Sequence, residues 1–263
     1  MTDNKTLSKK KESNVIPFDI AGLEADAGLG LQNVTQEDLA LPFLKILTAE
    51  DAETVGGEAR GGDIYNTVTL EVFKGDVGIK VVPCVYQRRY VEWAPEGTQG
   101  APLNIYTPQD KTAGKMPKTE QRGDDRTDFI VGSDNYIETT AQHYVVVVDD
   151  EGRMETGLIT MKKTRLKKSK AWNSMMQSRV EMGKEGPFIP PAFAYVYNLT
   201  TEKQKNDKGQ WNTWKITLDG KVPSADIYNF CKAFAKSIEE GDVIVKHEND
   251  EVTVEKDAGD SPF

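Results

Sequence analysis

The fold is decided by a stretch rich in β-branched and aromatic side chains, Ile79-Lys80-Val81-Val82-Pro83-Cys84-Val85-Tyr86-Gln87-Arg88-Arg89-Tyr90-Val91-Glu92-Trp93. Such side chains favour an extended strand. Neighbouring side chains of a strand point to opposite faces. Strict alternation therefore predicts one face made of Val82, Cys84, Tyr86, Arg88 and Tyr90. The same alternation predicts an opposite face made of Val81, Val85, Arg89, Val91 and Trp93.

Further strand patterns lie on both sides of this stretch. Segment 64–73 precedes it, and Gly75 and Gly78 mark the turn between the two. Downstream, segments 135–148 and 153–161 flank Asp149-Asp150-Glu151-Gly152, which is typical of a hairpin turn. A second hairpin is predicted from 192–201 and 211–218.

Two helices are predicted among these strands. Segment 164–182 has Thr164 as a candidate N-cap and ends before Gly183. Segment 224–240 begins at Ser224 and ends before Gly241, and its apolar residues recur at helical spacing at Ile227, Phe230, Cys231, Phe234 and Ile238. Strand hairpins with two helices and long loops indicate a β-rich α+β fold, with a small barrel as the expected form.

The chain divides into one domain with polar ends. Residues 1–14 are Lys-rich and polar, and we expect them to be disordered. Residues 15–241 form the predicted single domain, in which 97–128 is a long polar loop of the kind that is functional or disordered. Residues 242–263 form an acidic C-terminal tail.

Composition excludes several protein classes. The 263 residues contain no apolar run that approaches the length of a membrane span, and the polar N-terminus is not a secretory signal. The two cysteines, Cys84 and Cys231, are far apart in sequence and suit a reducing cytoplasm. We therefore expect a cytoplasmic protein without membrane contact.

No catalytic or metal-binding motif is present. The sequence has no phosphate-binding loop, no complete dinucleotide fingerprint and no Gly-x-Ser-x-Gly elbow. The two histidines, His143 and His247, are isolated, and neither cysteine has a ligand at metal spacing. We expect a non-enzyme with no cofactor and no metal, although a nuclease site made of carboxylates alone stays open as a rival.

Positive charge is concentrated in one segment. The net charge of −9 comes mostly from residues 238–263, which hold nine acids and two bases, whereas 162–184 holds eight bases and one acid. Six of these bases fall within nine residues: Lys162, Lys163, Arg165, Lys167, Lys168 and Lys170. Clustered bases bind phosphates and release counterions. The alternative is an ordinary solvated helix face.

Aromatic rings accompany the bases. Tyr86, Arg88 and Tyr90, with the adjoining Arg89, could form a strip that stacks on nucleobases and pairs with phosphates. Equally, the two tyrosines could close the core, with their hydroxyls at its edge. Trp172 follows the basic segment and serves either as a stacking ring or as core.

The second hairpin adds a further candidate ring. Alternation along the strand places Trp214 on the same face as Ile216 and Leu218, which predicts that it lies in the core. Trp211 shares parity with Lys215, which predicts exposure beside a loop that carries Lys203, Lys205 and Lys208. An exposed ring next to bases is a candidate for stacking on a single strand.

The tail ends in an aromatic residue after proline, Asp257-Ala258-Gly259-Asp260-Ser261-Pro262-Phe263. An acidic tail alone predicts only disorder. A terminal Phe ring with its carboxylate can also dock in a small apolar pocket with a basic rim on a partner. The predicted partner-binding residues of the tail are Asp257, Asp260, Pro262 and Phe263.

The ending Asp260-Ser261-Pro262-Phe263 resembles the tails of bacterial single-stranded DNA-binding proteins and of the T7-type phage single-stranded DNA-binding protein. Ser261 stands where the bacterial tails have Ile. The segments 90–93, 166–176 and 206–211 are similar to a family of tailed-phage proteins that bind single strands. The resemblance implies an OB-like barrel, sequence-tolerant binding of single-stranded DNA, a role in phage replication or recombination, and tail contacts with a polymerase, helicase or nuclease.

The leading hypothesis is a single-stranded DNA-binding protein in the host cytoplasm. The six bases above would contact phosphates, Tyr86, Tyr90, Trp172 and Trp211 would stack, and Arg88, Arg89 and Lys215 would assist. Two other functions stay open: a single-strand annealing protein of recombination, and a phage structural or interaction protein that binds no nucleic acid. The sequence leaves homo-oligomer formation open.

Overall fold

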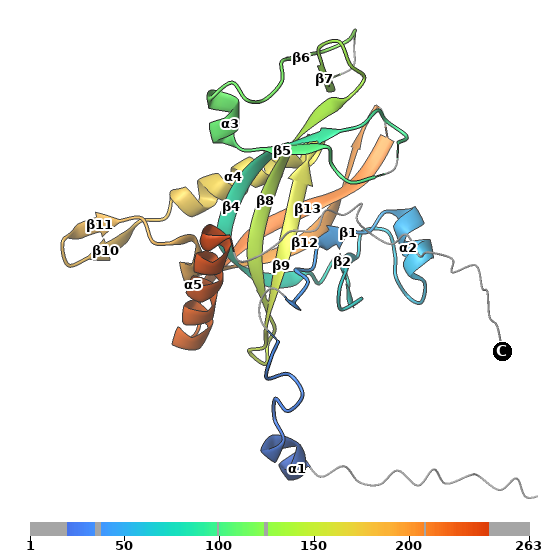
Figure 1. Cartoon of the computed structure of the whole chain (residues 1–263). Coiled ribbons are helices and arrows are strands. Elements are labelled where there is room, and N and C mark those ends of the chain that lie inside the picture. Colours follow the sequence, from blue (N-terminus) through green and yellow to red (C-terminus); the bar gives the residue numbers. More distant parts are fainter. Residues whose placement is uncertain (1–19, 35–37, 99, 124–125, 208, 242–263) are drawn as a thin grey trace, which may run out of the picture.

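The structure is a computed structural model that describes residues 20–34, 38–98, 100–123, 126–207 and 209–241. Strands dominate this part and helices are few (Figure 1), so the predicted β-rich α+β class is confirmed. Within the described ranges, none of the helices has the length and apolar character that a membrane crossing requires. The predicted segments 1–14 and 242–263 lie outside the described residues.

Five long antiparallel strands form the centre of the molecule. They are β4 (Ile79–Trp93), β8 (Tyr136–Val148), β9 (Met154–Lys162), β12 (Tyr195–Asn206) and β13 (Gly209–Lys221). Their order is β13-β12-β4-β8, and β9 pairs with β8. Both predicted hairpins are present, as β8–β9 and β12–β13.

Strand β4 contains a bulge that strict alternation does not predict. Its register against β8 shifts between Pro83 and Val85. Proline has no backbone donor, and within sheets it is found at edges and bulges. The extra residue reverses the alternation, so Tyr86 packs against one core while Val82 and Cys84 belong to the other. The predicted grouping of Val82 and Cys84 with Tyr86 is therefore wrong.

The sheet has a hydrophobic core on each face. The helix α4 (Leu166–Gln177) contributes Trp172 to the first core, which also contains residues of all five long strands. The helix α5 (Ala225–Glu240) contributes Cys231 and Phe234 to the second core. Figure 1 shows α5 in front of the sheet and α4 behind it. Burial of both faces explains why the strands are apolar at neighbouring positions.

Helix α5 has the ends that the sequence predicts. The Ser224 side chain accepts a hydrogen bond from the Ile227 amide, and Gly241 adopts a left-handed conformation with φ of 85°. A side chain with a Cβ is disfavoured in that conformation, so glycine ends the helix. Phe230 has the predicted spacing but is 37% exposed.

Helix α4 is shorter than the predicted 164–182. A short turn, η2 (Lys163–Arg165), precedes it, and no side chain caps its start, so the predicted Thr164 cap is wrong. After it, the chain forms a small hairpin of β10 (Glu181–Gly183) and β11 (Gly186–Phe188). The turn η3 (Ala192–Ala194) then leads into β12.

The predicted polar loop 97–128 contains short regular elements. These are β5 (Asn104–Tyr106), α3 (Pro108–Thr112) and β6 (Thr119–Glu120), and β7 (Asp128–Ile130) follows. The Asn104 amide and the Tyr106 hydroxyl both donate to the buried Glu92 carboxylate of β4, at 2.9 and 2.8 Å. Burial, together with this bond, raises the pKa of Tyr106 to about 12. These bonds fix the start of the connection on the main sheet.

A small three-stranded sheet lies against the main one. It consists of β1 (Leu44–Ile46), β2 (Ile64–Asn66) and β3 (Val72–Phe73), with α2 (Ala49–Val55) between the first two strands. The predicted single strand 64–73 is thus two strands joined by a turn. Strand β1 contacts both β9 and β13. Upstream of it, α1 (Ile20–Ala25) stands away from the sheets (Figure 1).

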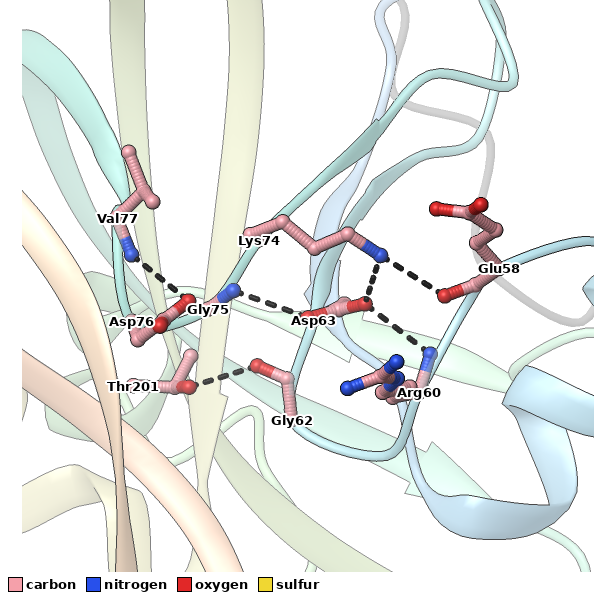
Figure 2. Close-up of polar contacts among 9 residues, drawn as sticks. All are labelled: Glu58, Arg60, Gly62, Asp63, Lys74, Gly75, Asp76, Val77 and Thr201. Carbon is pink, nitrogen blue, oxygen red and sulfur yellow. Dashed lines mark hydrogen bonds and ion pairs between the residues drawn. The ribbon is translucent and has the colours of Figure 1, made fainter.

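A buried carboxylate joins the loop before β2 to the turn after β3 (Figure 2). Asp63 accepts hydrogen bonds from the backbone amides of Arg60 and Gly75, at 3.1 and 3.0 Å. Lys74 donates both to Asp63 and to the Glu58 carbonyl, at 3.3 and 2.8 Å. The charge of Asp63 is therefore satisfied by local donors.

The same turn contacts the main sheet (Figure 2). The Thr201 hydroxyl of β12 donates to the Gly62 carbonyl, and its amide donates to the Gly75 carbonyl, both at 2.7 Å. A Cβ at Gly75 would lie 2.1 Å from the Gly62 carbonyl oxygen. Only glycine allows this approach, which brings the small sheet beside the β12–β13 hairpin.

Candidate nucleic-acid interface

The six clustered bases surround the start of α4. Lys162 is the last residue of β9 and forms an ion pair of 3.2 Å with the buried Glu138. Lys168 forms an ion pair of 2.7 Å with Glu202 of β12, and this hydrogen bond lowers the pKa of Glu202. These two acids offset part of the charge that the sequence places here.

Three of the lysines remain available to a ligand. Lys163, Lys167 and Lys170 are exposed, and among the described residues none of them forms an ion pair. Lys163 lies in η2 with a positive φ of 50°, an uncommon conformation for a residue other than glycine. Lys167 and Lys170 lie on the side of α4 that faces away from Ser169 and Trp172, which are its buried residues.

The start of α4 is held against the β12–β13 hairpin. The Arg165 guanidinium donates to the Asn212 carbonyl of β13 at 3.2 Å, and Lys168 reaches Glu202 of β12. These contacts hold the start of α4 close to a part of the hairpin that carries exposed lysines. These lysines are Lys203, Lys205 and Lys215. We call residues 163–170 together with this hairpin the cationic junction.

The two hairpin tryptophans differ in burial. Trp214 is 1% exposed and lies in the first core, as its parity predicts. Trp211 pairs across the hairpin with Gln204 and is half-buried rather than fully exposed, and its indole nitrogen is buried without a hydrogen-bond partner among the described residues. Lys203 pairs with Asn212 and Lys205 with Gln210, so both lysines lie on the face opposite Trp211, and the prediction that the ring lies beside them is wrong. Lys215 shares the face of Trp211, where the partly open ring can offer one surface to a flat ligand. Lys208, at the tip, lies outside the described residues.

Trp172 is part of the core and does not reach the surface. It is 0% exposed, stacks on His143 with ring centroids 4.6 Å apart, and meets Tyr197 edge-on at 5.7 Å. Its assignment as a stacking ring is therefore wrong for this conformation. The core alternative, which the sequence left open, describes its position.

His143 holds α4 to the sheet. Its Nε2 atom lies 2.8 Å from the Ser169 hydroxyl, and its ring lies against Tyr86 on one side and Trp172 on the other. Burial lowers the pKa of His143 to about 3. The ring is therefore neutral at physiological pH and acts as a structural contact.

Tyr86, Arg88 and Tyr90 do share a face of β4, but they lie largely inside the molecule. Tyr86, and to a smaller extent Tyr90, raise the pKa of Arg88 through hydrogen bonding. Tyr90 is 8% exposed, and the Lys111 ammonium of α3 lies 4.7 Å from its ring centre. Only the half-buried Tyr86 and Arg88 retain exposed surface. The alternative in which the tyrosines close the core fits better than an open stacking strip.

Arg89 points away from this strip. Its guanidinium donates to the Gln87 side chain and to the Arg88 carbonyl, and it lies close enough to Tyr144 of the second core to affect that hydroxyl. Arg88 and Arg89 therefore belong to opposite faces of the sheet. The structure does not bring all the predicted site residues together.

The 94–135 connection carries cations that the sequence reading did not select. Lys115 and Lys118 are exposed, Lys111 lies over Tyr90, and the Arg122 guanidinium lies 4.6 Å from the Phe129 ring centre. The sequence shows these cations only as basic residues within a polar loop. The fold is needed to show which aromatic rings they contact.

The tail residues Asp257, Asp260, Pro262 and Phe263 lie outside the described residues. In the described part of the chain, no group of three or more His, Cys, Asp or Glu side chains is arranged to hold a metal ion.

Comparison with known protein families places most of the chain in a phage family. The model of a family described as Pam3 phage gp34-like protein matches residues 10–244, which is most of the chain. No curated protein and no solved structure matches.

Proposed function

Because the chain belongs to the Pam3 phage gp34-like protein family, we propose that it acts during phage DNA replication or recombination in the host cytoplasm, by binding single-stranded DNA. The observation that carries the proposal is the cationic junction. It brings exposed lysines of two distant segments close together, and Lys215 lies on the same strand face as the half-buried ring of Trp211. Clustered cations with an accessible ring suit the phosphates and bases of an unpaired strand.

The order of the long strands supports an OB-like interpretation. Strand β4 pairs with β8 and β12, β8 pairs with β9, and β12 pairs with β13, while α4 lies between β9 and β12. An OB-fold has a comparable chain order, with five strands in a partly open barrel. Among the described residues β9 and β13 do not pair directly, and β1 contacts both. We interpret β1 as filling the gap between them.

This interpretation agrees with the location of the cations. OB-folds bind oligonucleotides with the face of their second and third strands and with the loops after the first and fourth strands. Here those loops correspond to 94–135, with Lys111, Lys115 and Lys118, and to the β12–β13 turn. The lysines of the 94–135 connection and of the β12–β13 hairpin therefore fall near where such a fold binds its ligand, whereas those of α4 follow its third strand.

The roles of the residues follow from their positions. Lys163, Lys167, Lys170, Lys203, Lys205 and Lys215 contact phosphates, and Trp211 stacks on a base. Arg165, Lys162 and Lys168 position the junction through their contacts with Asn212, Glu138 and Glu202. The proposal includes no catalytic step and no cofactor, and it assigns the acidic tail to the recruitment of a polymerase, helicase or nuclease.

The test compares matched double variants. Binding of a labelled oligo-dT and of a duplex of equal length is measured by fluorescence anisotropy at several salt concentrations. Lys167→Ala/Lys170→Ala is expected to reduce the slope of log affinity against log salt by about 1.4, because each lost contact with a single strand accounts for about 0.7. Lys232→Ala/Lys236→Ala on α5 removes the same charge elsewhere and is expected to leave the slope unchanged.

Other outcomes favour the other functions. Absence of salt-dependent oligonucleotide binding in the wild-type protein would contradict the proposal and favour a structural or interaction protein. Pairing of complementary strands in the same preparation would indicate an annealing protein. Cleavage of the oligonucleotide with added Mg²⁺ would indicate a nuclease.

A further inference from the structure

The hairpin of β10 and β11 has an apolar face that no part of the described chain covers. The register pairs Met182 with Pro187, so these two side chains share a face, and alternation adds Val180 and Ile189 to it. Val180, Met182 and Ile189 are 61, 77 and 62% exposed, and Pro187 is also exposed. Four neighbouring apolar side chains in solvent are typical of an interaction surface.

The other face of the hairpin is anchored to the body. The Glu181 carboxylate accepts a hydrogen bond from the Tyr195 hydroxyl and forms an ion pair of 2.9 Å with Lys221. Arg179 lies over the Tyr195 ring at 5.9 Å. This face also carries Phe188, which pairs with Glu181 and is 48% exposed. Glu181 ties the face to β12 and β13, and the face of Met182 and Pro187 points outward. Figure 1 shows the hairpin projecting from the molecule beside α5.

The tip of the hairpin carries two opposite charges. Lys184 and Glu185 form the turn beyond the Gly183–Gly186 pair, and both are exposed. These two long side chains follow the row of Met182 and Pro187 along the hairpin. The outward face thus has two apolar rows and ends at an acid–base pair.

We propose that this face binds the same face of a second copy of the chain, forming a two-fold symmetric dimer. A two-fold axis along the hairpin places β10 of each copy over β11 of the other. Val180 then meets Ile189, Met182 meets Pro187, and Lys184 of each copy meets Glu185 of the other. In this arrangement apolar side chains meet apolar side chains and each base meets an acid. The face is therefore complementary to itself, which favours a second copy as its occupant.

An isolated two-stranded hairpin is at best marginally stable in water. Within the described chain, β10 and β11 pair only with each other. The dimer therefore supplies the cover that the hairpin lacks. The hairpin follows the end of α4, whereas the cationic junction surrounds the start of α4. The dimer interface therefore leaves the proposed DNA-binding surface open. The dimer is independent of the proposed function.

The experiment uses the charged pair, because both residues are at the exposed tip and their substitution spares the fold. The mass of the full chain is measured by light scattering and sedimentation over a range of concentrations. The wild-type protein is expected to be a dimer. Lys184→Glu alone or Glu185→Lys alone is expected to weaken the dimer by about tenfold, because each places like charges together at two symmetric contacts.

Mixing the two variants gives the sharpest result. In a mixed dimer, both acids of the Lys184→Glu chain face both lysines of the Glu185→Lys chain, so association is expected to return to the wild-type level. Met182→Asp is expected to abolish the dimer, whereas Val77→Asp, at a position 72% exposed elsewhere, is expected to leave it intact. A wild-type protein that remains monomeric, or single variants that associate like the wild type, would overturn the proposal.

Discussion

At the scale of single residues, His143 shows how burial changes a chemical role. A histidine in a soluble protein is a candidate base, yet this ring is 1% exposed and bonded to Ser169. Its pKa of about 3 lies far below the usual value of about 6.5. The folded state therefore favours the neutral form of the His143 ring.

This difference predicts a specific dependence of stability on pH. The folded pKa is lowered, so the unfolded state binds the proton more readily, and stability is lost as pH falls from about 6.5 toward 3. Each pH unit in this window costs up to about 1.4 kcal/mol. Between pH 7.5 and pH 5, the wild-type free energy of unfolding should fall by about 2 kcal/mol more than that of His143→Gln, measured by urea denaturation.

A matched variant separates charge from packing. Ser169→Ala removes the hydroxyl partner but keeps the ring, so its loss of stability between the two pH values should equal that of the wild type. Equal losses in the wild type and in His143→Gln would show that His143 does not stay neutral in the fold.

Single residues also show where the two-residue alternation of a strand predicts burial correctly. Alternation along β13 predicts Trp214 in the core and Trp211 nearer the surface, as the structure has them. Trp172 could not be assigned in this way, because a helix face becomes core or surface only when its partner is known. Here the partners are β8, which carries His143, and β12, which carries Tyr197.

At the scale of elements, the sequence predicts which helices and hairpins form better than it predicts which faces and contacts they have. The two hairpins and α5 follow from local signals, namely the acidic turn at 149–152, the Ser224 cap and Gly241. The reversed face of β4 could have been suspected from Pro83, which interrupts strand pairing. The contacts of Lys162 and Lys168 with Glu138 and Glu202 could not, since each partner comes from a distant part of the chain.

The β12–β13 hairpin supports a prediction about Trp211. Replacing Trp211 with Ala should weaken oligo-dT binding by about 1–3 kcal/mol, the range for loss of one stacked base. Trp211→Phe keeps a flat ring and should retain most of the affinity. Both variants are compared by anisotropy after circular dichroism has shown that they are folded. Equal affinities for Trp211→Ala and the wild type would remove this ring from the interface.

At the scale of the whole molecule, charge is divided between two regions. The body carries the cationic junction, while residues 242–263 hold seven acids and two bases. Opposite charges on one chain attract over roughly the Debye length, which is about 8 Å at physiological salt. We therefore propose that this acidic segment competes with phosphates for the lysines of its own body, and that the competition weakens as salt increases.

Removing residues 242–263 tests this competition. The truncated chain keeps the described domain, including α5 and Gly241, so its free energy of unfolding should not change. Its affinity for oligo-dT at low salt should equal or exceed that of the full chain, because the lysines lose an internal competitor. The difference in affinity between the two chains should shrink at higher salt. In a separate pull-down, the immobilised truncated chain should no longer capture a replication partner. A truncated chain that binds DNA more weakly at every salt concentration would place these residues in the DNA-binding surface itself and contradict their assignment as a competing segment.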